Sequence, residues 1–211
     1  KNTSRVLDIG IGTGRIAIPL LKENIKLDGL DYSPDILDKC KKRLIKESLQ
    51  ANLYEGAMQN FSLENKYDLI ICGFRVFLLN LTMEDQLKTL INFKKHLTKN
   101  GKVIISFFSF AYFYKNFKKQ QLIREFKDKD GNDWTIKYEF SFNFIDQIIY
   151  TKIKHFCSNK LVSTTNADMR WIYKNEFELL SKLAGYKDIN LHGGFERQKF
   201  TGEQELVWVI K

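Results

Sequence analysis

An aspartate and three glycines near the N-terminus have the residue types and spacing of a ligand-binding turn. The segment VLDIGIGTG (residues 6–14) is a hydrophobic run ending in Asp8, followed by Gly10, Gly12 and Gly14 at alternate positions. A glycine-rich turn between a strand and a helix lets a ligand approach the backbone closely. A dinucleotide would place its pyrophosphate at this turn, where the Asp8 carboxylate would repel it. The same carboxylate would attract an ammonium or a sulfonium group.

A second carboxylate narrows the choice of ligand. Asp31 ends the next predicted strand, over residues 26–31, where it is placed to accept hydrogen bonds from both hydroxyls of a ribose. A ligand with a cationic amino-acid end and a nucleoside end satisfies Asp8 and Asp31 together, and S-adenosylmethionine is such a ligand. The fold alone would also allow a nicotinamide-dependent dehydrogenase, and Asp8 argues against it.

Three further residues are candidates for catalysis. Arg75 lies in GFRVF, after a central strand and at the edge where open α/β sheets bind ligands. It either holds a carboxylate or phosphate of the second substrate or forms a surface ion pair. His155 is more consistent with a structural role. Asp168 and Arg170 lie where the segment over 120–172 returns to the rest of the chain, and their favoured role is to hold these two layers together. No group of His, Cys, Asp and Glu has metal-ligand spacing, so no metal site is predicted.

The composition is that of a globular protein. The chain has 211 residues, of which 44% are hydrophobic and 28% charged. Three scattered cysteines suggest small buried hydrophobes in a reducing compartment. Without a secretory leader or a run of about 18 apolar residues, we predict a cytoplasmic protein with no membrane partner. The net charge of +9 would suit nucleic acid, but the lysines are spread along the chain, which disfavours that partner.

Strands and helices alternate through the first half of the chain. Apolar runs predict five strands, over residues 5–9, 26–31, 52–56, 67–74 and 102–110. Helical spacing predicts helices over 15–24, from Ser33-Pro34 onward, and over 82–97, the last ended by Asn100-Gly101. This alternation with short connections predicts a parallel sheet covered on both faces.

The pattern changes from about residue 120 to 172, where apolar and polar residues alternate between turn signals and predict antiparallel strands. A helix over 173–185 and closing strands over 189–195 and 205–211 follow. The predicted fold class is α/β: a Rossmann-like, doubly wound, mostly parallel seven-stranded sheet with an antiparallel β insertion after strand five. We divide the chain into an S-adenosylmethionine-binding core (1–110), the insertion as a lid or dimer element (111–172), and a closing segment (173–211).

The same motifs resemble a known family. VLDIGIGTG, LDGLDYSPDIL and the block over residues 67–108 are similar to the class I S-adenosylmethionine-dependent methyltransferases. The resemblance is nearest to small bacterial sugar-amine and amino-acid N-methyltransferases, which also carry antiparallel strands after strand five. It implies S-adenosylmethionine as the cofactor and methyl transfer, by direct displacement, to a small-molecule acceptor that is by preference an amine. It leaves a homodimer open.

The resemblance also implies contacts to the cofactor, residue by residue. Asp8 and the three glycines would form the turn beneath the methionine part, Asp31 would bind the ribose hydroxyls, and Tyr32 would lie against the adenine. Ala57 stands where the family has an acid for the adenine amine, and Met58 would pack on the base. The end of strand four would approach the transferred methyl group with Cys72, Gly73 and Phe74.

Two alternatives stay open. An RNA or protein methyltransferase would suit the positive charge, although CGFRVF lacks the Asn/Asp-Pro-Pro-aromatic signature of enzymes that methylate exocyclic base amines. A cofactor-binding protein without catalysis is suggested by Ala57. Family members also have some tens of residues before strand one, so we expect the natural chain to continue before Lys1.

Overall fold

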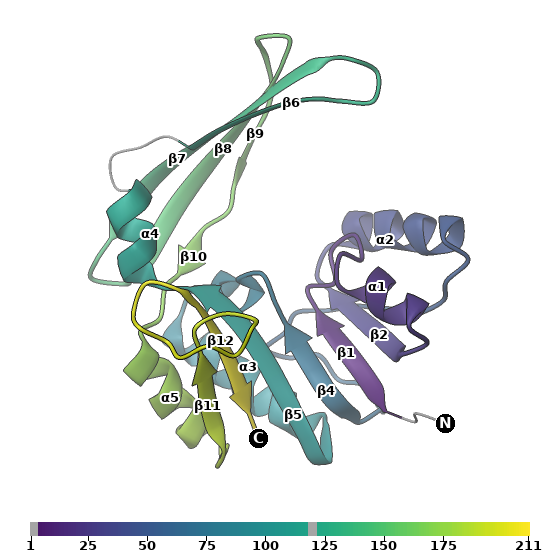
Figure 1. Ribbon diagram of the computed structural model, residues 1–211, viewed down its shortest axis with the longest axis vertical. Helices are drawn as coiled ribbons and strands as arrows, with labels where there is room; N and C mark the ends of the chain where they lie inside the picture. The colour runs from purple at the N-terminus through teal and green to yellow at the C-terminus, as the bar shows by residue number, and fades with distance from the viewer. Residues whose placement is uncertain (1–3, 118–121) are drawn as a thin grey trace.

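A seven-stranded sheet forms the main body of the protein in a computed structural model, which describes residues 4–117 and 122–211 (Figure 1). The strand order is β11-β12-β5-β4-β1-β2-β3. Strand β12 is antiparallel to both of its neighbours, and the other pairs are parallel. The predicted fold class is therefore confirmed. The strands of this sheet are β1 (Arg5–Ile9), β2 (Lys26–Asp31), β3 (Asn52–Glu55), β4 (Tyr67–Cys72), β5 (Leu97–Phe108), β11 (Ile189–His192) and β12 (Glu205–Ile210).

Helices cover both faces of the sheet. Helices α1 (Ala17–Lys22) and α2 (Pro34–Lys46) lie on one face, and α3 (Met83–Lys95) and α5 (Lys174–Leu183) lie on the other (Figure 1). Successive side chains of a strand point to opposite faces. Thus Val6 packs in the cluster under α1 and α2, while the next residue, Leu7, packs in the larger cluster on the opposite face. Burial of both faces explains why these strands are almost wholly apolar.

Local signals set where the helices on each face begin. Ser33 precedes Pro34, and its hydroxyl accepts a hydrogen bond from the backbone N–H of Ile36 at 3.4 Å. Thr82 starts α3 in the same way, by accepting from the N–H of Asp85 at 3.0 Å. Such caps satisfy backbone donors that the first helical turn leaves free.

The end of α3 differs from the prediction. The helix stops at Lys95, and Asn100-Gly101 lies within β5 rather than at a helix end, so that prediction is wrong. The backbone carbonyl of His96 accepts a hydrogen bond from the N–H of Tyr67 at 2.8 Å, directly after the helix. Pairing with β4 therefore draws the chain out of the helix before the turn signal is reached.

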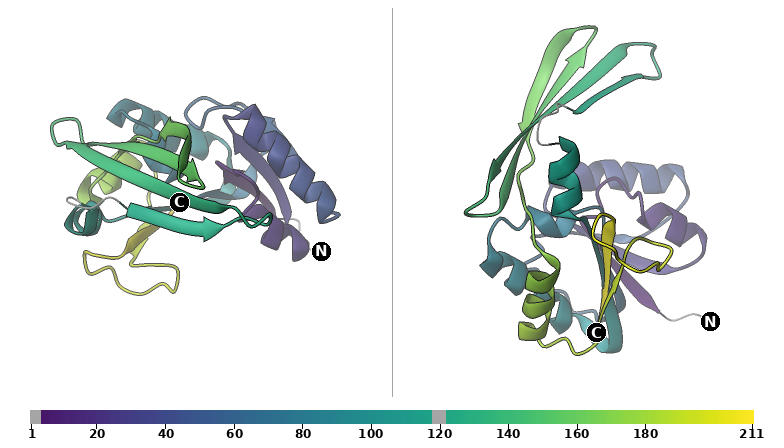
Figure 2. Two further views of the ribbon diagram at one scale, coloured as in Figure 1. Left: turned by 90° about the horizontal axis from the view of Figure 1, so that it is seen from above. Right: turned by 60° about the vertical axis from the view of Figure 1, so that its left-hand side comes forward.

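The insertion after β5 is a second, antiparallel sheet that rises above the carboxyl ends of the parallel strands (Figures 1 and 2). The predicted antiparallel strands are confirmed. They are β6 (Leu122–Lys127), β7 (Asp133–Asn143), β8 (Ile148–Cys157), β9 (Lys160–Asn166) and β10 (Met169–Arg170). A helix that the sequence did not predict, α4 (Phe110–Phe117), precedes them. Aromatic packing holds it in place, because the ring of Phe110 stacks on Trp171 with 3.7 Å between centroids.

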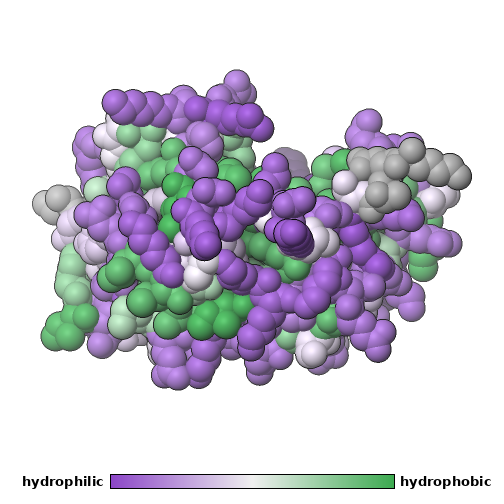
Figure 3. Space-filling model, turned by 90° about the horizontal axis from the view of Figure 1, so that it is seen from below, coloured by the Kyte–Doolittle hydropathy of each residue, from purple (hydrophilic) through white to green (hydrophobic). Residues whose placement is uncertain are grey.

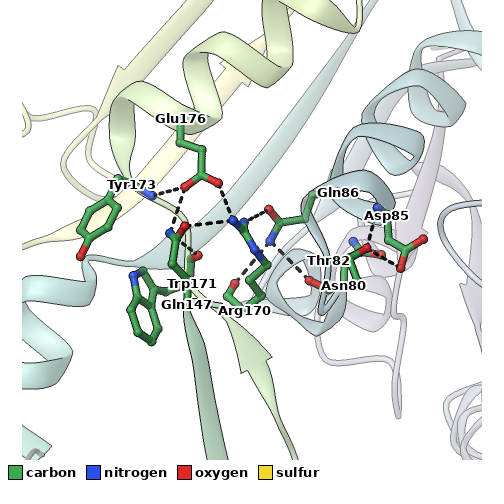
Figure 4. A network of polar contacts seen from close by, with 9 residues as sticks. All are labelled: Asn80, Thr82, Asp85, Gln86, Gln147, Arg170, Trp171, Tyr173 and Glu176. Atoms are coloured by element: carbon green, nitrogen blue, oxygen red, sulfur yellow. Dashed lines mark hydrogen bonds and ion pairs between the residues drawn. The ribbon is translucent and has the colours of Figure 1, made fainter. Parts of the chain in front are cut away.

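Arg170 fastens the insertion to the core. Its guanidinium donates to Gln86 of α3 at 2.7 Å, to Gln147 at 3.0 Å and to Glu176 of α5 at 2.6 Å (Figure 4). Only 8% of the Arg170 side chain is exposed, and its three partners lie on α3, on α5 and in the turn between β7 and β8. These contacts agree with the favoured interpretation of Arg170 as a link between the two layers. The hydrogen bond of Asp168, for which the same role was predicted, stays within the insertion, because its carboxylate accepts from the N–H of Thr151.

The surface opposite the insertion shows no single apolar face. Seen from that end, hydrophilic residues cover much of the protein, with hydrophobic residues between them (Figure 3). Among the residues that the structure describes, no helix combines the length and the hydrophobicity needed to cross a membrane.

Candidate functional site

The glycine-rich turn joins β1 to α1 and leaves an opening at its centre. Gly10, Gly12 and Gly14 have φ values of +66°, +57° and +85°, in the left-handed region that glycine adopts without steric cost. A Cβ on Gly10 would lie 2.7 Å from the side chain of Val76, so the turn packs against the segment after β4. A Cβ on Gly12 would meet nothing closer than a backbone oxygen at 3.8 Å. A ligand can therefore reach the backbone at Gly12.

The two predicted carboxylates lie at neighbouring strand ends. Asp8 is 2% exposed and Asp31 is 9% exposed. Asp31 accepts hydrogen bonds from the N–H of Gly12 at 3.0 Å and of Ser33 at 3.1 Å, which ties the glycine turn to the end of β2. Burial, and to a smaller extent the Asp31 charge, raises the pKa of Asp8 to about 7. A cation beside Asp8 would favour its ionised form.

A pocket of about 190 Å³ lies over this turn. Asp8 and Gly12 form one side, and Gly73 and Phe74, from the end of β4, form the other. The Arg15 guanidinium lies 4.9 Å from the centre of the Phe74 ring. Cys72, by contrast, is fully buried in the core, and burial raises the pKa of its thiol, so its side chain does not line the pocket.

The residues predicted to hold the adenine lie beyond Asp31. Tyr32 is 73% exposed, directly after β2. Ala57 and Met58 follow β3, whose end is joined to β2 by a hydrogen bond from the N–H of Gly56 to the Asp31 carbonyl at 3.0 Å. The Met58 sulfur lies 3.2 Å from the Asn80 amide nitrogen, which donates to it. These residues therefore flank the same sheet edge as the two carboxylates.

The three catalytic candidates lie in different places. Arg75 follows Phe74 directly and lies 4.0 Å from a carboxylate oxygen of Glu205. His155 lies near the end of β8, away from the core sheet, with a ring nitrogen 3.2 Å from the Ser163 hydroxyl. Asp168 accepts a hydrogen bond from the N–H of Thr151 at 3.1 Å, within the insertion. Of the three, the structure brings Arg75 alone next to the pocket over the glycine turn.

Comparison with known proteins agrees with this geometry. A family model described as a methyltransferase domain matches residues 6–101, which include the glycine turn, both carboxylates and the end of β4. This stretch of the chain is therefore similar to a methyltransferase domain. S-adenosylmethionine is the cofactor that the sequence motifs predict for this site.

The relatives of this chain are distant in sequence. The chain is 30% identical over 102 residues to the dTDP-3-amino-3,4,6-trideoxy-alpha-D-glucopyranose N,N-dimethyltransferase of Streptomyces venezuelae, a match covering 48% of this chain and 41% of that relative. It is 19% identical over 214 residues to the cypemycin N-terminal methyltransferase of a Streptomyces species, covering 97% of this chain and 81% of that protein. The solved CcbJ methyltransferase of Streptomyces caelestis shares the fold, with a TM-score of 0.85, 19% identity, and coverage of 100% of this chain and 84% of that one.

The residues around the glycine turn fit S-adenosylmethionine. A cationic ligand would relieve the cost of ionising the buried Asp8, and the free space at Gly12 admits a ligand to the backbone. The carboxylate oxygens of Asp31 have lone pairs beyond the two that accept from the backbone, so they can also accept from ribose hydroxyls. Within the described part of the chain, no cluster of His, Cys, Asp and Glu could hold a metal ion.

Sequence reasoning missed Glu205 and Ser106. Ser106 of β5 holds the turn after β4, because its hydroxyl accepts from the N–H of Phe74 at 3.3 Å and its carbonyl accepts from the N–H of Arg75 at 3.0 Å. Phe74 and Arg75 both have left-handed backbones, with φ values of +50° and +70°. A lone acid at the start of an apolar strand carries no recognisable signal, and only the pairing of β12 with β5 brings Glu205 here.

Proposed function

We propose that this methyltransferase transfers a methyl group from S-adenosylmethionine to the nitrogen of a small-molecule amine. The observation that supports it most directly is the pair of buried carboxylates, Asp8 and Asp31, beside the open glycine turn. Two relatives are named for amine acceptors, a sugar amine and a peptide N-terminus. At the identities found, these names suggest the class of nucleophile rather than a particular acceptor.

The cofactor supplies a methyl carbon made electrophilic by its sulfonium sulfur. The amine nitrogen uses its lone pair to form the new N–C bond as the C–S bond breaks, and the nitrogen then loses a proton. In this scheme Asp8 holds the cationic amino-acid end, Asp31 holds the ribose, and Gly73 with Phe74 lies near the transferred carbon. Alignment and exclusion of water supply much of the acceleration.

An amine acceptor also suits the position of the histidines. A hydroxyl acceptor usually needs a general base. His155 lies out along β8. His96 is buried directly after α3, and one of its ring nitrogens accepts from the N–H of Leu63 at 3.1 Å. The third histidine, His192, ends edge strand β11. None of the three lines the pocket over the glycine turn.

Transfer of a radioactive methyl group tests the proposal. The chain is incubated with S-adenosylmethionine labelled with tritium in the methyl group and with a panel of amines, alcohols and short RNAs. We expect labelled product from amines, and loss of at least about tenfold in Asp31→Ala, whose carboxylate would bind the ribose. Asp68→Ala, a carboxylate at the opposite end of the sheet, is the matched control and should keep its activity. Label in alcohols or RNA, and none in amines, would contradict the proposal.

A further inference from the structure

A second pocket, of about 650 Å³, lies between the core and the insertion sheet. Helix α4 stands between these two layers (Figure 2). Aromatic rings form a continuous wall: Phe108 of β5 packs on Phe113 of α4 with 4.6 Å between centroids, and Phe113 packs on Phe140 of β7 with 5.1 Å between centroids. This aromatic pocket can therefore bury the apolar part of a small molecule.

The aromatic pocket borders the cofactor pocket. Phe74 lines the pocket over the glycine turn, and the next residue, Arg75, lines the aromatic pocket. Both N–H groups of this turn are bonded to Ser106. A molecule in the aromatic pocket thus reaches the methyl-donor side of the protein across a single, firmly held turn.

One carboxylate in the aromatic pocket is partly buried and weakly paired. The Glu205 side chain is 25% exposed, and the Arg75 guanidinium is 4.0 Å away, beyond hydrogen-bond distance. Burial raises the pKa of Glu205, and Arg75 opposes this. The guanidinium also lies 5.2 Å from the centre of the Phe108 ring, so it is only partly committed to Glu205. The carboxylate keeps the capacity to accept from a cationic donor.

The other charges in the aromatic pocket do not favour an anion. Among the described lining residues, two arginines face two glutamates, so the formal charges cancel. Arg124 lies 5.9 Å from the centre of the Tyr138 ring, and Glu203 is bonded to Lys115 at 2.9 Å. A phosphate or diphosphate group would need several unpaired cations. Here two glutamates accompany the two arginines and would repel such a group, and the lining has no net positive charge to hold it.

The insertion adds a neutral polar group. Thr151 of β8 lines the aromatic pocket and is 4% exposed. Within the described part of the chain, its buried hydroxyl has no hydrogen-bond partner. Because an unpaired buried hydroxyl costs free energy, a polar substituent of a bound molecule would be stabilised there.

Building on the proposed function, we infer that the aromatic pocket binds the methyl acceptor. The acceptor is a small amine with an apolar ring or chain and without a phosphate group. Glu205 selects it by holding its ammonium group, and the Glu205 carboxylate takes one proton from that group before the nitrogen lone pair attacks the methyl carbon. If the Glu205 charge were lost, Arg75 would remain as a free cation beside the aromatic wall. The pocket would then favour a carboxylate over an amine.

Fluorine NMR titration can test this inference with three probes of one shape. 4-Fluorobenzylamine, 4-fluorobenzyl alcohol and 4-fluorophenylacetate are titrated into the protein saturated with S-adenosylhomocysteine. For the wild type we expect the amine to bind at least about tenfold more tightly than the alcohol, through a charge-assisted hydrogen bond. In Glu205→Gln that preference should fall below about twofold, and the phenylacetate should become the best ligand. Glu178→Gln, an acid of α5 that is bonded to Lys182 and does not line the aromatic pocket, is the matched control and should keep the amine preference.

The reversal from amine to carboxylate is the decisive result, because a purely structural effect of Glu205→Gln would weaken all three probes alike. Equal binding of amine and alcohol by the wild type, no binding of any probe, or equal effects of the two variants would overturn the inference. These outcomes are distinct from failure of the proposed function. Amines that are methylated equally well by the wild type and by Glu205→Gln would leave that function standing and remove Glu205 from acceptor selection.

Discussion

Replacing Asp8 by asparagine should stabilise the fold at high pH and weaken binding of the cofactor. The carboxylate is 2% exposed, and its pKa of about 7 is well above the 3.8 of an unfolded chain. Between these two values the folded state holds a proton that the unfolded state has lost. Stability contributed by this group is therefore present below about pH 4 and is lost as pH rises towards 7, by on the order of 4 kcal/mol. Asp8→Asn should thus raise the urea midpoint at pH 8.

Binding of the cationic cofactor should follow the opposite trend. Only the ionised form of Asp8 attracts the ligand, and with a pKa of about 7 the ionised fraction is about 9% at pH 6 and about 76% at pH 7.5. The dissociation constant for S-adenosylmethionine should therefore fall about eightfold over that range in the wild type. Asp8→Asn should bind weakly, with a flat profile.

Isothermal titration calorimetry at six pH values between 6 and 7.5 would measure this. Asp68→Asn, a carboxylate that accepts from Arg5 N–H at the opposite end of the sheet, is the matched control and should keep the wild-type profile. A flat profile in the wild type, or an unchanged slope in Asp8→Asn, would refute the assignment of Asp8 as the group that binds the cation.

Two further substitutions test how the fold holds the site. Gly10→Ala adds a Cβ at φ +66° and 2.7 Å from Val76, and should lower the free energy of unfolding in urea by about 2–4 kcal/mol. Gly131→Ala, at φ +84° in open space, is the control and should lower it by about 1 kcal/mol. Equal losses in the two variants would contradict the packing argument. Arg170→Met removes the cationic partner of the Glu176 carboxylate and should cost about 3–5 kcal/mol. Lys182→Met breaks an exposed pair and should cost less than about 1 kcal/mol, so similar losses would deny Arg170 its linking role.

The sequence alone was sufficient to predict the alternation of strands and helices in the core. It also predicted that Asp8 and Asp31 lie at the same edge of the sheet. Asp8 and Asp31 end strands that pair in parallel, and parallel strands bring their carboxyl ends to one edge. The antiparallel insertion was also predictable, because a period of two is visible in residues 133–143. Helix α4 was not, because its aromatic residues fit a strand as well as a helix until Phe110 packs on Trp171.

The acceptor side was decided by tertiary structure. Arg75 and Glu205 are far apart in the chain, and they meet because β12 enters the sheet antiparallel to β5 and pairs Glu205 with Phe108. Neither residue type nor spacing encodes that register. The glycine turn and its two acids could be predicted from local sequence, because parallel pairing of β1 with β2 brings Asp8 and Asp31 to one edge of the sheet. A pocket built from a core strand, an unpredicted helix and an inserted sheet exists only once all three have packed.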